Sequence, residues 1–172
     1  MAERWRGASH AVTVRDLTAY RKSIVQLGVG NADLSESSSM GELLEMPNGL
    51  VKMGWSFREV MYVGAEESSC DELLVEVARL EREEDTCVRD VSHGLRVLEL
   101  VGESVLELLG FVCNLELTRQ AVPGVLRTRI ADVDGALALF SLAPQRVWLL
   151  VDRSHGEYLD EVLASVSDEL GR

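Results

Sequence analysis

Few residues of this chain combine the types and the spacing that chemistry requires. Cys87, Asp90 and His93 come closest to a metal-ligand set, because thiolate, carboxylate and imidazole groups are common ligands of Zn²⁺. We expect these residues to lie in a helix, where a separation of six places Cys87 and His93 on different sides. The sequence therefore predicts no metal site.

The possible nucleophiles and the possible calcium loop have simpler explanations. Ser154 adjoins His155, but neighbouring side chains seldom point at one another in catalytic geometry, and Ser154 is typical of a helix cap. The sequence DVDG at 132–135 has Ile130 where a calcium loop needs its first carboxylate, which indicates a turn. Cys70 precedes an expected helix, whose dipole favours a thiolate, and is the thiol to test for reactivity. We expect no catalytic residue, no cofactor and no enzymatic activity.

Composition limits the classes of partner. The formal net charge of the 172 residues is −12 at pH 7, and the isoelectric point is near 4.7. Nucleic acids and anionic membrane surfaces bind proteins through clustered Lys and Arg, so we expect neither as a partner. An acidic surface is suited instead to partners with a basic patch. We expect a protein or peptide partner, and a monomer or a homodimer.

Cysteine usage and hydropathy indicate the compartment. The three cysteines are an odd number without framework spacing, which favours a reducing compartment over a disulfide-bonded secreted domain. No apolar run approaches the roughly 18 residues that span a bilayer, and residues 1–10 lack the apolar core of a secretory signal. We expect a cytoplasmic protein, with a mitochondrial or nuclear location as the alternatives.

Apolar spacing of three and four residues predicts helices at 13–27, 71–84, 88–109 and 154–170. Alternation between turn signals predicts strands at 42–46, 50–55, 59–63, 111–118, 125–130, 136–142 and 146–151. Gly102 predicts either a break in the third helix or close packing there. The order α-βββ-α-α-ββββ-α, with antiparallel strands and helices packed on one face, defines an α+β fold. Residues 1–12 are expected to be a disordered N-terminal segment.

An internal duplication agrees with this fold. At a fixed offset of 86 residues, 48–84 lies over 134–170 without a gap. The identical pairs are Gly49 with Gly135, Ser68 with Ser154, Leu73 with Leu159, Ala78 with Ala164 and Glu83 with Glu169, and Tyr62 falls on Trp148. A turn glycine, a helix cap and core-facing helix positions are what a structural repeat retains. We expect a single domain, 13–172, made of two related halves, 13–84 and 85–172.

Two aromatic residues depart from the repeat and define a candidate binding site. Trp55 and Phe57 align with a serine and an alanine, so the common core does not fix a bulky side chain at either position. We expect both aromatic side chains to form a partly exposed patch, rimmed by Arg58 and Glu59. Aromatic and Arg residues are enriched in interface hot spots, which makes these four residues the predicted partner-binding site.

Two resemblances point to interaction proteins. The stretch 53–80, which begins Met-Gly-Trp, is similar to the tail of PUB domains, where Gly-Phe precedes a strand and a closing helix. Those domains bind a C-terminal peptide of a segregase ATPase, so the resemblance implies an adaptor. The residues that line their pocket have no counterpart here, where Ala19-Tyr20-Arg21 is nearest. The low isoelectric point and the element order resemble those of small bacterial secretion chaperones.

We therefore predict a non-enzymatic protein-interaction module, an adaptor or a subunit of a larger assembly, with a peptide- or protein-binding surface. A small acidic chaperone that holds a client chain is one alternative. An enzyme with a small-molecule pocket between the two halves is the other alternative.

Overall fold

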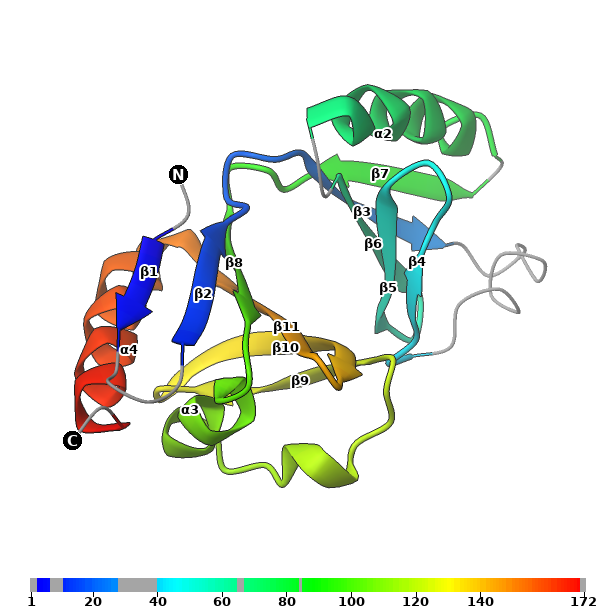
Figure 1. Cartoon of the computed structure of the whole chain (residues 1–172). Helices are drawn as coiled ribbons and strands as arrows, with labels where there is room; N and C mark the ends of the chain where they lie inside the picture. Colours follow the sequence, from blue (N-terminus) through cyan, green and yellow to red (C-terminus); the bar gives the residue numbers. More distant parts are fainter. Residues whose placement is uncertain (1–2, 7–10, 28–39, 65–66, 84, 171–172) are drawn as a thin grey trace. The chain divides into compact units, whose positions relative to one another are not determined.

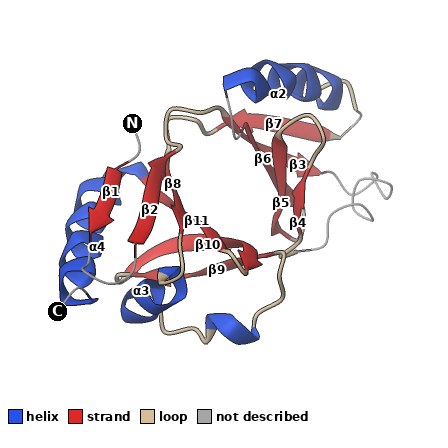
Figure 2. Cartoon of the chain, in the orientation of Figure 1, coloured by secondary structure: helices blue, strands red, loops and turns tan. Residues whose placement is uncertain are grey.

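The structure is a computed structural model that describes residues 3–6, 11–27, 40–64, 67–83 and 85–170 (Figure 1). The chain forms two compact units. Unit 1 comprises Met1–Thr18 and Gly94–Arg172, and unit 2 comprises Ala19–His93, so the chain of unit 2 is inserted into that of unit 1. Each unit combines an antiparallel sheet with at least one helix (Figure 2), which confirms the predicted α+β class.

Unit 1 contains a six-stranded sheet in the order β1-β2-β8-β11-β10-β9, in which all neighbours are antiparallel. Its strands are β1 (Glu3–Arg6), β2 (Ala11–Asp16), β8 (Leu95–Val101), β9 (Gly124–Ile130), β10 (Val133–Leu142) and β11 (Gln145–Asp152). Its helices are α3 (Val105–Val112), α4 (Gly156–Leu170) and the short 3-10 helices η1 (Leu117–Arg119) and η2 (Arg153–His155).

Helices α3 and α4 cover one face of this sheet. Successive strand residues point to opposite faces, so only alternate residues of β8 and β11, such as Leu98 and Leu149, reach this core. The helices supply residues one turn apart, Leu108 with Val112 and Leu159 with Leu163. Full burial of each such side chain contributes about 1.5–3 kcal/mol, which makes this core the main stabilising element of unit 1.

Unit 2 contains a five-stranded antiparallel sheet in the order β4-β5-β6-β3-β7. Its strands are β3 (Lys22–Leu27), β4 (Leu43–Glu45), β5 (Leu50–Ser56), β6 (Glu59–Gly64) and β7 (Thr86–Asp90). Helix α2 (Glu67–Leu80) lies along one face and buries Leu73 and Leu80 against Val25, Leu50, Val60 and Tyr62. None of the helices in the described ranges has the length and apolar content that crossing a membrane requires.

The predicted helix at 13–27 is wrong, because these residues form most of β2, a turn and β3. Asp16 ends β2, since its Oδ1 accepts a hydrogen bond from the Thr18 backbone N–H at 2.8 Å. This short-range bond is an Asx turn, which competes with helix formation. Of the apolar residues spaced by three and four, Leu17 and Tyr20 therefore lie in the turn, and Ile24 and Leu27 lie in β3.

The predicted helix at 88–109 is wrong over most of its length. These residues form the end of β7, a turn, β8 and the beginning of α3. Leu98 lies in the helix-covered core, and Val97, on the other face of β8, is also fully buried. A strand that is apolar on both faces has no periodicity that distinguishes it from a buried helix. Gly102 lies between β8 and α3 and has a φ of 152°, so regular structure is interrupted at this residue.

The predicted strand at 111–118 is wrong as well. Phe111 and Val112 complete α3, because Gly110 lies inside that helix and does not end it, and Leu117 begins η1. The other predicted strands coincide with β4, β5, β6, β9, β10 and β11 to within a few residues. The predicted helices at 71–84 and 154–170 coincide in the same way with α2 and α4.

The internal duplication is not confirmed. The stretches 48–84 and 134–170 do contain the same kinds of element, β5-β6-α2 and β10-β11-α4. Their gapless alignment, however, pairs Tyr62 with Trp148. Tyr62 points into the helix-covered core of unit 2, whereas Trp148 alternates with the residues of β11 that reach α3 and α4. A register error of one residue moves a side chain to the other face, so the aligned positions have different surroundings.

The aligned glycines also have different roles. Gly49 lies in the β4–β5 turn with a φ of 77°, whereas Gly135 lies within β10. A Cβ atom on Gly135 would lie 2.7 Å from the carbonyl oxygen of Leu150. The bounds of the two units differ from those of the predicted halves, 13–84 and 85–172. That the two halves are related to one another stays a prediction. Within 1–12, the described residues form β1 and the start of β2.

Candidate functional site

Four strands of unit 1 bring charged and aromatic side chains together on one face of the sheet. Arg15 in β2 pairs with Glu99 in β8, and Glu99 pairs with Trp148 in β11. Directly paired residues of neighbouring strands point to the same face. Phe140 in β10 and Arg146 in β11 contact this row. We call these five residues the Glu99 cluster.

Glu99 is the centre of the cluster. The Nε atom of Arg146 donates to its Oε1 at 2.8 Å, and the indole Nε1 of Trp148 donates to the same oxygen at 3.0 Å. The other oxygen, Oε2, lies 3.8 Å from Nη1 of Arg15. Glu99 is only 8% exposed, and burial of an unpaired carboxylate would be strongly unfavourable. Two guanidinium groups and one indole N–H offset that cost.

The aromatic residues hold Arg146 in place. The guanidinium carbon of Arg146 lies 4.2 Å from the centre of the Phe140 ring, a cation–π distance. The Phe140 and Trp148 rings are 4.9 Å apart and tilted by 55°, a favourable aromatic arrangement. Arg146 is therefore oriented by a carboxylate and by a ring, and its charge has a fixed position on the sheet.

The cluster is suited to recognition more than to covalent chemistry. Its carboxylate is the most buried charged group, whereas the side chains of Arg146 and Arg15 are 29% and 43% exposed. Arginine stays protonated at all ordinary pH values, so it supplies charge and hydrogen-bond donors but transfers no proton. These five residues can stabilise a fixed charge pattern on the sheet and offer no thiol, hydroxyl or imidazole to a substrate.

The predicted partner-binding residues lie together at the β5–β6 hairpin of unit 2. Phe57 and Arg58 form the turn, and Phe57 is 81% exposed. Trp55 is half-buried at the end of β5. Glu59 begins β6 and accepts a hydrogen bond from Ser56 Oγ at 2.8 Å. The structure thus brings the four residues to one hairpin, and their contact with a partner stays a prediction.

The residues considered for a metal site lie in a strand and a turn. Cys87 and Asp90 belong to β7, and His93 follows in the turn before β8, so the expected helical surroundings are wrong. The hydrogen bonds from the Ser92 hydroxyl and backbone N–H hold the pKa of Asp90 below its usual range. Over the residues that the structure describes, no group of three His, Cys, Asp or Glu residues could hold a metal ion.

Asp152 caps the short helix η2, which precedes α4. Its Oδ1 accepts hydrogen bonds from the backbone N–H of Ser154 at 2.8 Å and from the Ser154 hydroxyl at 2.6 Å. These bonds lower the pKa of the Asp152 carboxyl. The predicted cap at Ser154 is therefore corrected, since Ser154 is the donor in this turn. Among the thiols, Cys70 lies half-buried in the first turns of α2, and Cys113 is buried beside Thr128.

Sequence reasoning missed the Glu99 cluster because it assigned 88–109 to a helix. In a helix with apolar residues on several sides, nothing distinguishes the Glu99 side chain as buried or paired. A signal was nevertheless present, since Glu99 is a lone carboxylate between Leu98 and Leu100 in an apolar run. A carboxylate at such a position needs a cationic partner when buried. The residues that meet this need, Arg146 and Trp148, are some 50 positions away in the chain.

No family model and no curated protein sequence matches this chain. Solved structures do share its fold. One is a chain of the heterotetrameric sarcosine oxidase from Corynebacterium sp. U-96 in complex with pyrrole 2-carboxylate, with a TM-score of 0.75 and 20% identity. That match covers 94% of this chain and 86% of that chain. Another is the glycine cleavage system aminomethyltransferase T from Bartonella henselae, with a TM-score of 0.67 and 12% identity over 87% of this chain and 44% of that chain.

These matches correct the predicted function. Both similar structures are enzymes or parts of enzymes, so the prediction of a pure adaptor, with a chaperone as its alternative, is wrong. The identities are low, and what this chain shares with the two enzymes is the fold. A fold hosts many functions, so the assignment of an activity needs further argument.

Proposed function

We propose that this chain is an enzyme-associated domain, a component of an enzyme that acts on a small amine. Sarcosine is N-methylglycine, and an aminomethyl group is also a one-carbon unit bonded to nitrogen. The names of the two similar enzymes thus have a glycine-derived amine in common. This is the substrate class that we propose for the enzyme as a whole.

The extent of the two structural matches carries the proposal. The match to sarcosine oxidase covers 94% of this chain and 86% of the other, so two chains of comparable length share one fold. That oxidase is a heterotetramer and therefore an enzyme of several chains. The match to the aminomethyltransferase covers only 44% of that chain, so most of that protein lies outside the common fold. The common fold thus makes up most of one chain and part of a longer chain in the other case, and a component of an enzyme fits both observations.

In this proposal the catalytic groups belong to a partner chain of the enzyme, and this chain has no activity of its own. The Glu99 cluster has a positioning role. It fixes the charges of Arg146 and Arg15 on the sheet of unit 1 through a hydrogen bond of 2.8 Å and an ion pair of 3.8 Å, respectively. Such a fixed pattern favours one orientation of a partner over others, because like charges brought together at an interface are costly.

The composition of the native assembly tests this proposal. The full chain, tagged and expressed in its source organism, is purified without dissociating conditions, and the proteins retained in stoichiometric amount are identified by mass spectrometry. We expect at least one larger chain with the sequence of an amine-oxidising or aminomethyl-transferring enzyme. Recovery of the chain alone, or only with proteins that are not enzymes, would overturn the proposal.

A further inference from the structure

A groove runs between α3, α4 and the β9–β10 turn of unit 1. Its volume is about 290 Å³, and its lining residues are Phe111, Val112, Asn114, Ala131, Asp132, Tyr158, Val162 and Val166. Pockets for small molecules usually measure roughly 300–1,000 Å³, so this groove is at the lower limit for a complete ligand. Its size suits one or two side chains of a protein partner.

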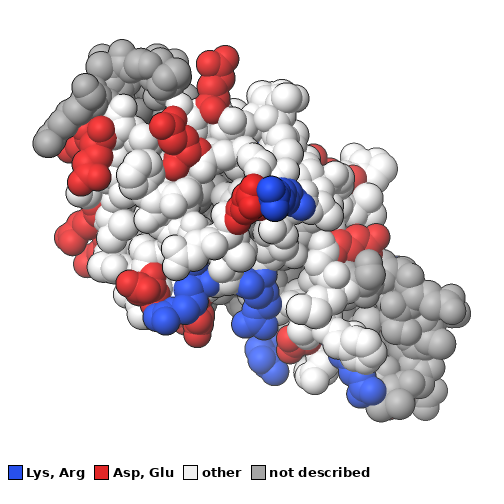
Figure 3. Space-filling view, turned by 90° about the horizontal axis from the view of Figure 1, so that it is seen from below, with Lys and Arg blue, Asp and Glu red and all other residues white. Residues whose placement is uncertain are grey.

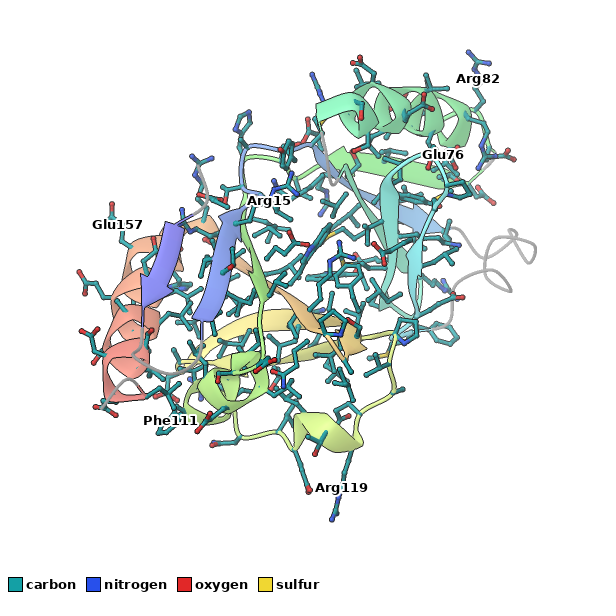
Figure 4. All side chains as sticks on the ribbon, viewed as in Figure 1. Arg15, Glu76, Arg82, Phe111, Arg119 and Glu157 are labelled. Atoms are coloured by element: carbon teal, nitrogen blue, oxygen red, sulfur yellow. The ribbon has the colours of Figure 1, made fainter. Side chains whose placement is uncertain are left out.

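Two large rings form the exposed walls of the groove. Phe111 on α3 is 58% exposed and Tyr158 on α4 is 46% exposed. Figure 4 shows Phe111 at the outer end of α3, beside α4. Tyr158, Val162 and Val166 follow at intervals of four residues and therefore form one stripe along α4. Exposed aromatic and aliphatic side chains in this arrangement are typical of a surface that receives a partner.

The groove is held open by the backbone. The N–H of Ala131 donates to the carbonyl oxygen of Val112 at 2.8 Å, which attaches the β9–β10 turn to the end of α3. Ala131 and Asp132 have positive φ angles of 49° and 67°, as the two central residues of a type I′ turn do. The α3 end and the β9–β10 turn are therefore fixed relative to one another, so binding needs little ordering of this side of the groove.

Most charged residues around the groove are acidic, with the exception of Arg129, whose guanidinium donates to the carbonyl oxygen of Asp132. Asp132 is part of the lining, and α4 carries Glu157, Asp160, Glu161, Asp168 and Glu169 with no Lys or Arg. At 100° per residue, Glu161 and Glu169 lie beside the Tyr158 stripe. Figure 4 shows Glu157 projecting outward from α4. Asp160 differs from the others, because Arg96 binds it at 2.7 Å.

We propose that this groove is the docking site for a basic amphipathic segment of the partner enzyme chain. An apolar side chain of that segment lies between Phe111 and Tyr158, and its Lys or Arg residues face Asp132, Glu161 and Glu169. A second copy of this chain is a poor occupant, because both copies carry a net charge of −12. The proposal rests on the proposed function, since it requires that an enzyme partner exists.

Site-specific cross-linking in the native assembly tests the docking site. The photoreactive residue p-benzoylphenylalanine replaces Phe111 or Tyr158 in the tagged full chain, and the linked peptide is sequenced by mass spectrometry. Val75, an equally apolar and 68% exposed residue on α2, is the control position. We expect positions 111 and 158 to link to one peptide of the enzyme chain that contains an apolar residue flanked by Lys or Arg.

Affinity measurements with charge-reversal variants complete the test. Glu161→Lys together with Glu169→Lys should weaken binding of the purified enzyme chain at least about tenfold, and less at high salt, because the repulsion is screened. Glu72→Lys together with Asp71→Lys on α2 changes the charge equally and should have little effect. Phe111→Ala with Tyr158→Ala should also weaken binding at least about tenfold, with little loss of stability.

The outcomes separate the two proposals. If an enzyme chain copurifies but positions 111 and 158 link to a second copy, to an acidic peptide or to nothing, the docking site is wrong and the proposed function stands. Equal affinity of the α4 and α2 charge variants would also overturn the docking site. If no enzyme chain copurifies, the proposed function fails, and the docking proposal fails with it.

Discussion

At the scale of single residues, Tyr62 links the core of unit 2 to the solution pH. Burial, together with a smaller effect of the nearby charge of Glu76, raises the pKa of Tyr62 from an ordinary value of 10.0 to about 12, and Arg79 opposes this shift only weakly. Because the folded pKa is above the unfolded one, the neutral phenol stabilises the fold fully below pH 10. This contribution decreases as the pH rises from about 10 to about 12.

A pH series on Tyr62→Phe measures this contribution. We expect the free energy of unfolding of the natural chain to fall over this pH range by about 2 kcal/mol more than that of the variant, since two pKa units correspond to about 2.7 kcal/mol and most of this is lost by pH 12. Urea unfolding at intervals between pH 9 and pH 12 is the measurement. Parallel curves for the two proteins would contradict the assignment.

Glu99 is the residue whose loss should matter most to the polar cluster of unit 1. Glu99→Ala leaves the Trp148 N–H and the Arg146 guanidinium without their acceptor, and we expect a loss of about 2 kcal/mol in unfolding free energy. Glu99→Gln keeps an acceptor oxygen and should cost less than Glu99→Ala. Glu116→Gln, which breaks an exposed ion pair with Arg119, should change stability by less than about 0.5 kcal/mol. Equal effects of Glu99→Ala and Glu116→Gln would mean that the cluster contributes nothing.

At the scale of elements, substitutions of two glycines distinguish a steric requirement for glycine in a strand from the low propensity of glycine for a helix. A Cβ on Gly135 would lie 2.7 Å from the Leu150 carbonyl oxygen in the neighbouring strand, whereas a Cβ on Gly110 in α3 would meet nothing within 4 Å. We expect Gly135→Ala to destabilise the protein by roughly 1–3 kcal/mol and Gly110→Ala to stabilise it by up to about 1 kcal/mol. Thermal unfolding of both variants is the check, and a shift in the same direction for both would refute this explanation.

The β5–β6 hairpin is a second element with a testable role. Because Phe57 is exposed and Trp55 is half-buried, Trp55→Ala with Phe57→Ala should lower the unfolding free energy only modestly, by less than about 2 kcal/mol. If these residues contact a partner, the same variant should retain less of it in a pull-down. Val75→Ala on α2 is the matched exposed control. A loss of several kcal/mol, or unchanged retention of the partner, would exclude a role in binding.

The elements also show what the sequence could and could not predict. The Asn48-Gly49 turn signal and the one-sided apolar faces of α2 and α4 are local features, and these elements were predicted to within a few residues. The strands β2, β3 and β8 were not predicted. Which of their faces are buried depends on the rest of the sheet, and the local sequence pattern does not contain this information. Thr13 with Asp16 three residues later is typical of a helix start, but Asp16 is the acceptor of an Asx turn that ends β2.

At the scale of the whole molecule, the order of pairing explains why the site was missed. Unit 2 is inserted between β2 and β8, which are hydrogen-bonded neighbours in the sheet of unit 1. Arg15 and Glu99 are therefore far apart in sequence and opposite one another in space. By contrast, Trp55, Phe57, Arg58 and Glu59 are neighbours in the sequence, so their adjacency alone was enough to place them together.

The distribution of charge is the other property of the whole molecule that bears on function. On the face drawn in Figure 3, Lys and Arg side chains stand singly among Asp and Glu and between broad uncharged areas. A net charge of −12 favours association with basic surfaces and raises the rate of such encounters at low salt. This agrees with the proposal of a partner that carries a basic segment.

The most direct test of the proposed enzyme association is the activity of the native assembly. The complex purified through this chain is supplied with N-methylglycine and related small N-methyl amines, and substrate loss and oxygen consumption are recorded. We predict turnover that copurifies with the chain in a fixed ratio and is lost when the chain is removed from the complex. An assembly that turns over none of these amines, or an activity that is unchanged without this chain, would contradict the proposal.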